Sequence, residues 1–350
     1  IYAKIGGDVR PATNQNSILL QQKYYMTKVL GIGNALVDIL TMVEDELILE
    51  QLRLPKGSMQ LVSGTTCTMI GQTTAGMKQS KASGGSAANT IHGLARLGVE
   101  TAFIGHVGTD ETGQFFHADM QEAGIKPLLA KSDTPTGIAN GMITSDGERT
   151  FATYLGAAVE LSENHLDASL FKGFDYLYVE GYLVQNEQLL IKALELAQKE
   201  GLKIVLDLAS YNVVEANLAL LGRILEQFVD IVFANEEEAK AFTGKSPEES
   251  VDILGRICEV AVVKTGAKGS LIRQGENLVK VAAIKVEVKD TTGAGDLFAA
   301  GFLHGWINGW GLEKSGKSGS VLAGNVVEVI GPKMDTKRWE NIHRHLENLT

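Results

Sequence analysis

Cysteine is scarce in this chain, and its scarcity excludes a disulfide framework. Among the 350 residues only Cys67 and Cys258 are cysteines, far apart in the sequence and without the spacing of metal ligands. Small secreted domains depend on several disulfides, whereas reducing compartments keep thiols free. The cysteine content therefore favours a cytoplasmic protein and indicates no cysteine-based metal site.

Long apolar runs and an excess of positive charge are also lacking. No stretch approaches the roughly 20 apolar residues that a membrane helix needs, and the N-terminus lacks the charged, apolar and small-residue order of a signal peptide. The formal net charge is −10, which disfavours non-specific binding to nucleic acid or to an anionic membrane. We therefore expect neither a nucleic-acid partner nor a membrane partner.

Length and composition bound the domain organisation. The chain is 44% hydrophobic and 21% charged, which is ordinary for a globular protein with a sizeable core. Its 350 residues suit one large domain with an appendage, or two domains. Residues 1–25 are polar and unpatterned, and Met26-Thr27-Lys28 looks like a native start. We interpret residues 1–25 as a disordered extension and residues 26–350 as the folded unit.

From about residue 174 onward, predicted strands alternate with predicted helices. The strands are expected at 176–180, 203–208, 231–234 and 260–265, and this alternation predicts a parallel sheet with helices on both faces. Ligands of such sheets bind beyond the carboxyl ends of the strands. Upstream, the segments 37–43 and 58–62 and a hairpin around Asp146-Gly147 alternate apolar and polar residues. They predict a small antiparallel sheet that could form a lid.

The run from Asp290 to Leu303 reads DTTGAGDLFAAGFL and carries the chemistry. The alternation of residues 281–288 predicts a strand before it, and the pattern after Asp296 is helical. Glycines permit a tight turn and a close ligand, so the N–H groups of Gly293, Ala294 and Gly295 would form an anion site at a helix N-terminus. Asp296 beside this site predicts a general base for a hydroxyl that attacks phosphorus.

The alternative for Asp296 is an ordinary acid in the first turn of a helix, where the helix dipole favours it. The paired glycines and the second acid, Asp290, favour the catalytic interpretation. The run resembles, over its whole length, the second signature of the PfkB (ribokinase-like) family of sugar and nucleoside kinases. In that family the aspartate at the position of Asp296 is the catalytic base, and the turn before it is the anion hole.

The resemblance extends over residues 28–350 and includes the family's first signature, which residues 82–90, ASGGSAANT, resemble. It implies a doubly wound, mostly parallel α/β sheet flanked by helices, with a small β-sheet lid from segments of about 37–62 and 134–157. It implies transfer of the γ-phosphoryl group of ATP to a primary hydroxyl of a sugar or nucleoside. For the acceptor it implies contacts from Asn34, Asp38, Gly84, Gly85 and Asn89.

The acceptor residues also have structural interpretations. Asp38 could be a solvated turn residue, although a carboxylate suits vicinal hydroxyls because it accepts two hydrogen bonds at once. Small residues such as Gly85 also serve tight helix–sheet packing, and both roles are compatible.

On the nucleotide side, the resemblance implies ATP contacts from Asn235, Lys264, Thr265, Gly266, Gly269 and Asn325. It implies a Mg²⁺ ion held through water by Glu238, a carboxylate suited to a hydrated hard cation. The structural alternative is a capping box, with Asn235 as the cap and Glu238 at its third position. A monovalent cation such as K⁺ near Asp290 and Thr292 is a further hypothesis.

Two motif matches are rejected. Residues 31–36 begin like a dinucleotide fingerprint, but Leu36 stands where the third glycine belongs. Residues 311–318, GLEKSGKS, satisfy the P-loop expression, but the mechanism requires a strand before it and a helix is predicted there. We interpret this segment as a polar loop between two helices.

The acceptor itself is less determined. The segments 33–38 and 54–62 resemble adenosine kinases more than ribokinases, which favours an adenosine-like acceptor. A ribokinase- or fructokinase-type sugar kinase is the alternative, as is a non-catalytic sugar-binding relative, although the intact Asp296 and glycine turn oppose the latter. The protein could be a monomer or a homodimer paired through the lid edges.

Overall fold

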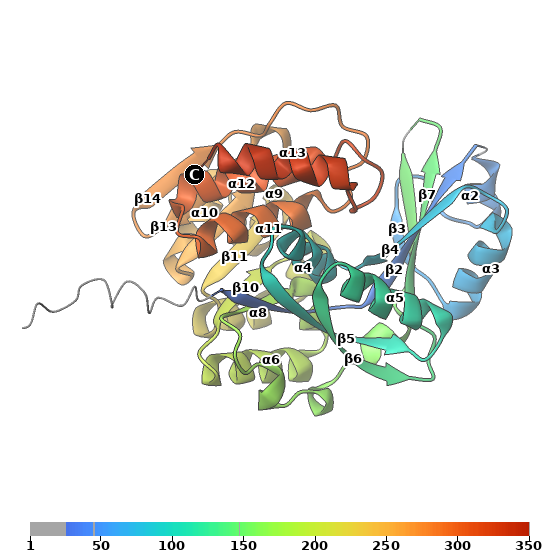
Figure 1. The fold of residues 1–350 in the computed structure, drawn as a ribbon, viewed down its shortest axis with the longest axis horizontal. Helices are drawn as coiled ribbons and strands as arrows, with labels where there is room; N and C mark the ends of the chain where they lie inside the picture. Colours follow the sequence, from blue (N-terminus) through green and yellow to red (C-terminus); the bar gives the residue numbers. More distant parts are fainter. Residues whose placement is uncertain (1–25, 45, 147, 350) are drawn as a thin grey trace, which may run out of the picture.

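The computed structural model describes residues 26–44, 46–146 and 148–349, so the predicted extension at residues 1–25 lies outside the described residues. None of the helices in this described part has the length and apolar character that crossing a bilayer requires. Two sheets organise the chain, one central to a large domain and one forming a lid beside it (Figure 1).

The large sheet has nine strands, and most of them are buried. Its strands are β1 (Lys28–Ile32), β5 (Glu100–Gly108), β6 (Ile125–Ser132), β9 (Tyr176–Glu180), β10 (Lys203–Asp207), β11 (Ile231–Asn235), β12 (Val260–Lys264), β13 (Ser270–Gln274) and β14 (Asn277–Val281). They follow the order β14-β13-β12-β11-β10-β9-β1-β5-β6. All pairs from β12 to β6 are parallel, whereas β13 and β14 pair antiparallel at one edge. The predicted doubly wound α/β fold is confirmed.

Most strands of this sheet are near-continuous apolar runs, as is typical of strands buried on both sides. Helices therefore cover both faces of the sheet. One face packs against α6 (Glu187–Lys199), α8 (Leu218–Gln227), α9 (Glu236–Thr243) and α10 (Pro247–Ile257), with the short α7 (Tyr211–Ala216) beside them. The other packs against α4 (Ser86–Arg96), α5 (Glu111–Glu122), α11 (Ala294–Ile307), α12 (Gly311–Val326) and α13 (Thr336–Glu347). Short 3₁₀ turns are η1 (Gly156–Glu160), η2 (Glu163–His165), η3 (Ala168–Leu170), η4 (Gly181–Gln185) and η5 (Gly266–Lys268).

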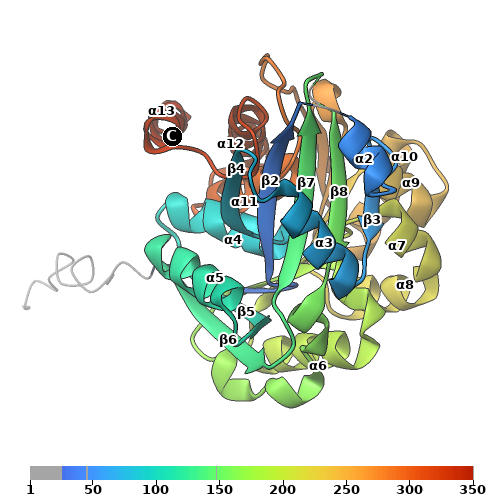
Figure 2. The same ribbon diagram turned by 90° about the vertical axis from the view of Figure 1, so that its right-hand side faces the viewer.

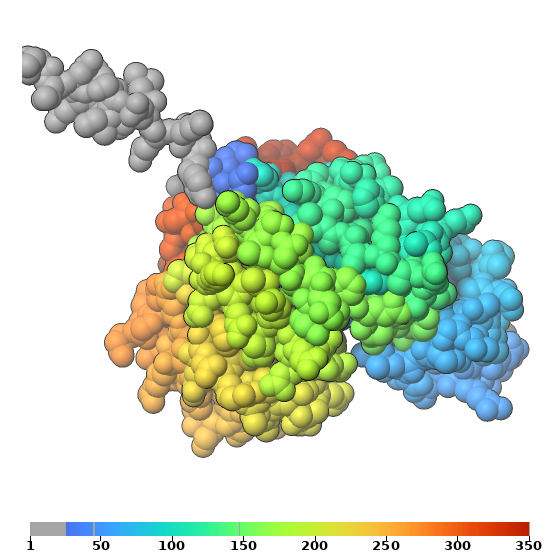
Figure 3. Space-filling view, turned by 90° about the horizontal axis from the view of Figure 1, so that it is seen from below, coloured from blue at the N-terminus to red at the C-terminus, as the bar shows by residue number. Residues whose placement is uncertain are grey.

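The lid is a five-stranded sheet with two small helices on its outer face (Figure 2). Its elements are β2 (Leu36–Val43), β3 (Met59–Leu61), β4 (Gln79–Gly84), β7 (Gly137–Thr144), β8 (Arg149–Tyr154), α2 (Leu47–Gln51) and α3 (Gly64–Thr74). Ile48, Leu49 and Ile70 pack on the sheet's outer side, and the lid projects as a separate lobe in blue and cyan (Figure 3).

Two details of the lid differ from the sequence predictions. The sheet is mixed, because β2 pairs with β7 in parallel and β3 with β8 in parallel. The strand β4, at the edge beside β2, was not predicted. Its residues Gln79 to Lys81 are exposed, and its inner end is small, so it lacks the apolar alternation that marks a half-buried strand.

The predicted strand at residues 281–288 is wrong. Strand β14 ends at Val281, and no regular strand follows before the turn at 290. Instead, Ile284 lies where a side chain at Gly324 would be, and the Lys289 and Asp290 N–H groups donate to the Val327 carbonyl. The apolar residues of this segment therefore pack along α12 and not into a sheet.

The rejection of a P-loop at residues 311–318 is consistent with the structure, but the predicted loop is wrong. These residues begin α12. Their small side chains permit close helix packing, because a Cβ at Gly301 would lie 2.6 Å from the Ser318 carbonyl oxygen and one at Gly305 would lie 2.8 Å from the Ser315 Cα. The Gly-Ser composition therefore serves contact between α11 and α12.

Candidate active site

The turn before α11 has the geometry expected of an anion site. Gly293 has a φ of 75°, in the left-handed region, and caps the helix that begins at Ala294. A Cβ at Gly293 would lie 2.8 Å from Pro332, so only glycine fits. The Ala294 N–H donates to the Thr291 carbonyl at 3.2 Å. It therefore closes the turn, which corrects the prediction that all three amides face a ligand.

A cation borders this turn. A Cβ at Gly295 would lie 3.2 Å from the Lys264 Nζ. The ammonium also donates to Asp207 at 2.8 Å, in a pair whose side chains are 14% and 4% exposed. Asp207 and nearby Glu238 raise the pKa of Lys264 against the effect of burial. The lysine predicted to bind ATP is thus charged and lies beside the glycine turn.

Asp296 is held between α11 and α4. Its Oδ1 accepts a hydrogen bond from Ser86 at 2.8 Å, and its Oδ2 accepts one from the Asn89 side chain at 3.0 Å. Burial raises the pKa of Asp296 to about 6, and the bonds from Asn89 and Ser86 oppose the rise. Asn89, which was predicted to contact the acceptor, orients the carboxylate through its side-chain N–H, and the acceptor contact stays a prediction. Ser86, which shares this task, was not predicted.

Asp38 and the paired glycines form the lid side of the site. The Asp38 side chain lies so close to β4 that a Cβ at Gly84 would be 2.3 Å from its carboxyl carbon. Gly85 has a φ of 98°, and a Cβ there would lie 2.2 Å from the Asn34 carbonyl oxygen. Neither position has room for a Cβ, so close packing requires both glycines, and their contact with an acceptor stays a prediction. Burial raises the pKa of Asp38 to about 7, and Lys333 opposes the rise.

Two acidic residues of the site were missed in the sequence. Glu180 accepts hydrogen bonds from the Asn34 N–H at 2.9 Å, the Asn34 side chain at 2.5 Å and the Ala87 N–H at 3.0 Å, and burial raises its pKa to about 7. Asp207 pairs with Lys264. Both are the last residues of parallel strands, where ligands of such sheets bind, and that position could have identified them.

The capping box at the start of α9 is confirmed. The Asn235 Oδ1 accepts from the Glu238 N–H at 2.8 Å, and Glu238 accepts from the Asn235 N–H and side chain, both at 2.7 Å. Burial and the neighbouring Asp207 raise the pKa of Glu238, against Lys264. The carboxylates of Asp207 and Glu238 are both buried and repel each other, so this pair suits a nearby cation. Because both oxygens of Glu238 already accept hydrogen bonds from Asn235, Glu238 would bind Mg²⁺ through water.

The loop after β12 closes on itself. The Thr265 N–H and hydroxyl donate to the Gly269 carbonyl at 2.8 and 3.0 Å. Gly269, with a φ of 99°, is structural, because a Cβ there would lie 1.9 Å from the Val281 carbonyl oxygen, whereas Gly266 borders open space. The hydrogen bonds of Asn325 are not to this loop. Its side chain donates to the Val321 carbonyl and accepts from Arg338.

Asp290 and Thr292, the hypothesised monovalent cation ligands, bind an arginine. The guanidinium of Arg149, from the lid hairpin, donates to the Asp290 carboxylate, to Thr292 at 2.6 Å and to Thr291 at 3.0 Å. The other Asp290 oxygen accepts from the Gly331 N–H at 2.7 Å. In this arrangement the guanidinium binds the side chains of both residues, and a monovalent cation near them stays a prediction.

The glycine turn presents backbone N–H groups, and the Lys264 ammonium lies beside it. The carboxylate of Asp296 follows directly and is held by two hydrogen bonds. This arrangement suits phosphoryl transfer to a hydroxyl. The fold and this site define a kinase, a phosphotransferase with an alcohol acceptor. Residues 62–337 match the pfkB family of carbohydrate kinases, and the chain belongs to this family.

Relatives include both nucleoside and sugar kinases. An adenosine kinase from Sinorhizobium meliloti is 33% identical with a TM-score of 0.82, covering 91% of this chain and 99% of its own. A probable sugar kinase from Rhizobium etli CFN 42 is 33% identical with a TM-score of 0.83, covering 93% and 99%. The 5-dehydro-2-deoxygluconokinase of Bacillus subtilis (strain 168) is 30% identical over 268 residues, 72% of this chain and 82% of its own length.

Proposed function

We propose that the protein is an ATP-dependent kinase that phosphorylates a primary hydroxyl of a neutral, adenosine-like nucleoside. The observation that carries this proposal is a row of side chains across the inner face of the lid. Asp38, Ala139, Thr153 and Leu61 are in register on the neighbouring strands β2, β7, β8 and β3. Residues opposite one another share a face of the sheet, so the row runs from a carboxylate to an apolar side chain.

The length of this row exceeds one sugar ring. Neighbouring strands lie about 4.8 Å apart, so Leu61, three strands from Asp38, lies roughly 14 Å from it. A carboxylate at one end suits vicinal hydroxyls. Ala139, between the ends, has a small side chain, and Leu61, which is 62% exposed, offers apolar surface at the other end. A ribose joined to a flat base spans such a row, whereas a lone sugar occupies only its first part.

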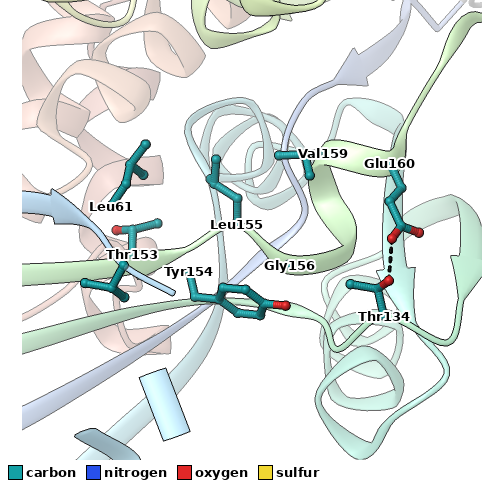
Figure 4. Close-up of a pocket in the computed structure, with 9 residues that line it drawn as sticks. Leu61, Thr134, Thr153, Tyr154, Leu155, Gly156, Val159 and Glu160 are labelled. Carbon is teal, nitrogen blue, oxygen red and sulfur yellow. Dashed lines mark hydrogen bonds between the residues drawn. The ribbon is translucent and has the colours of Figure 1, made fainter. Parts of the chain in front are cut away.

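A pocket of about 390 Å³ lies at the apolar end (Figure 4). Leu61, Thr153, Leu155 and Val159 are among the residues that line it. Pockets for small ligands are mostly apolar with few polar groups, and their volumes begin near 300 Å³. Val159 is 58% exposed, so burial by a flat base would remove apolar surface from water, which is favourable.

Charge favours a neutral acceptor over a sugar acid. On the acceptor side, the carboxylates of Asp38 and Asp296 share the ammonium of Lys333 with Asp119, while the Lys264 ammonium lies at the glycine turn and pairs with Asp207. An acceptor with its own carboxylate would add a further negative charge beside Asp38 and Asp296, which costs free energy in a partly buried site. This argues against the gluconate-type acceptor named for the Bacillus subtilis relative.

In the proposed reaction, Asp296 accepts the proton of the acceptor's primary hydroxyl, whose oxygen bonds to the γ-phosphorus of ATP. The bond from this phosphorus to the β–γ bridging oxygen breaks, and ADP leaves. A base with a pKa of about 6 is largely ionised at neutral pH and close enough to it to work efficiently. The N–H groups of Gly293 and Gly295 and the Lys264 ammonium stabilise charge on the transferred group. Glu238 would hold a Mg²⁺ through water, and the ion would neutralise phosphate charge when bound.

A panel of acceptors tests the proposal. ATP-dependent phosphorylation is measured with adenosine, other nucleosides, ribose, fructose and 5-dehydro-2-deoxygluconate. We expect a nucleoside to have the highest kcat/KM. A sugar or sugar acid that exceeds every nucleoside would refute the proposed acceptor and leave a sugar kinase, which the sugar-kinase relatives favour. Specific ligand binding without any phosphoryl transfer would instead indicate a non-catalytic relative.

A further inference from the structure

A short segment after α12 joins the anion turn to the lid. The Gly331 N–H donates to Asp290 at 2.7 Å, and Pro332 packs on Gly293 so closely that no Cβ would fit there. The next residue, Lys333, reaches the lid, where its Nζ donates to the Ser83 hydroxyl on β4 at 3.3 Å. Three consecutive residues thus contact the catalytic turn and the strand beside Asp38.

Ser83 is itself anchored from a second direction. Its N–H donates to the Asp119 carboxylate, on α5, at 2.9 Å. Ser83 and Ala82 of β4 pair with Val37 and Asp38 of β2. Lys333 and Asp119 therefore hold the stretch of β4 that lies directly beside Asp38, and a displacement of this strand would move the Asp38 carboxylate.

The charged groups around Lys333 come from several elements. Asp38 on β2, Asp119 on α5 and Asp296 on α11 attract its ammonium, while burial lowers its pKa to about 8. His92, on α4, is also close enough for Lys333 to lower its pKa. Asp38 in turn is repelled by Asp296 and Asp290 and attracted by Lys333. Asp38 is only 7% exposed, and a nearby cation favours its charged form against burial and the neighbouring carboxylates.

We propose that Lys333 is a positioning residue of the acceptor site: through Ser83 its ammonium holds β4 beside Asp38, and it supplies positive charge to the carboxylates gathered there for acceptor binding. The role of Asp38 in this inference rests on the proposed function. Lys333 acts through Asp38 and not on the transferred phosphoryl group. Its loss therefore weakens acceptor binding in a pH-dependent way, while ATP binding and the rate at saturating acceptor change less.

The first experiment measures the ionisation of Asp38 and needs no turnover. The protein is labelled with ¹³C-aspartate, and the Asp38 carboxyl resonance is identified by its loss in Asp38→Asn. The Lys333 ammonium opposes the rise in the Asp38 pKa, so we expect Lys333→Met to raise the Asp38 pKa further. Lys333→Arg should restore it. An unchanged Asp38 resonance titration in Lys333→Met would overturn the inference, whatever the acceptor proves to be.

The second experiment follows kcat/KM against pH with the best acceptor of the panel. In Lys333→Met we expect the acid limb to move to higher pH by the same amount, with about a tenfold loss per pH unit below it and recovery at high pH. Lys337→Met removes the same charge from an exposed site and should leave the profile unchanged. A loss that is equal at every pH, with an unmoved limb, would show that Lys333 is merely structural.

The two failures are distinguishable. If the wild-type protein phosphorylates neither nucleosides nor sugars, the proposed function fails, and the NMR titration still decides whether Lys333 controls Asp38. If the wild-type protein is active but Lys333→Met behaves as Lys337→Met, the function stands and the inference fails.

Discussion

Replacing Asp296 by asparagine separates the chemistry of this site from its architecture. The side chain keeps its shape, and its two bonds can be retained: the amide oxygen can accept from Asn89, and the amide nitrogen can donate to Ser86, whose hydroxyl can also accept. What is lost is the base. General base catalysis contributes about 10²–10⁴-fold, so we expect kcat to fall by that factor, or about 3–5 kcal/mol.

The same substitution should stabilise the fold. Burial raises the pKa of Asp296 from 3.8 to about 6, which means that the charged form is disfavoured in the folded protein. The penalty is absent below the unfolded pKa, grows between pH 4 and 6, and is complete above pH 6. A rise of this size corresponds to about 3 kcal/mol, and because the side chain is only partly buried we expect about 1–3 kcal/mol of added stability at pH 7.5.

Turnover by a coupled assay and thermal unfolding at pH 4 and 7.5 measure both effects. Relative to the wild type, Asp296→Asn should gain several degrees in Tm at pH 7.5 and little at pH 4. Asp133→Asn, at an exposed position, is the matched control and should change neither quantity. Turnover near that of the wild type would refute the base assignment. A lower Tm at pH 7.5 would refute the electrostatic argument.

Three further predictions concern the acceptor, the lid and pH. Ala139→Leu fills the middle of the row on the lid, so kcat/KM for a nucleoside should fall about 10–100-fold, while any activity with ribose persists. An equal loss for both acceptors would contradict the proposal that the nucleobase lies along this row. Arg149→Ala removes the contacts between the lid hairpin and the turn at 290–292, so amide hydrogen exchange should accelerate at residues 137–154 and not in β1. Unchanged exchange at residues 137–154 would show that these bonds do not hold the hairpin. The proposed reaction needs Asp38 and Asp296 to be ionised. We therefore expect kcat/KM to rise with pH through the range of about 6–7 set by their pKa values and then to level off. A flat profile from pH 5 to 8 would contradict both roles.

Much of the site could be predicted because its parts are local in sequence. The turn at Gly293 requires a left-handed residue followed by a helix, and this requirement is met within a few residues. The capping box of Asn235 and Glu238 likewise spans four residues. The failures were also local. Residues 281–288 alternate like a strand but pack on α12, since alternation records only that one side is buried and not what buries it.

The sequence by itself determined the alternation of strands and helices from about residue 174 to 265, the position of the glycine turn and the presence of a carboxylate beside it, because each depends on neighbours a few residues away. Only the tertiary structure decided which charges meet. Lys264 is 57 residues from Asp207, Arg149 is 141 from Asp290, and Lys333 is 250 from Ser83. Such pairs form when parallel strands end at one edge of a sheet and a lid packs across it, so they depend on strand order and packing, which no local pattern records.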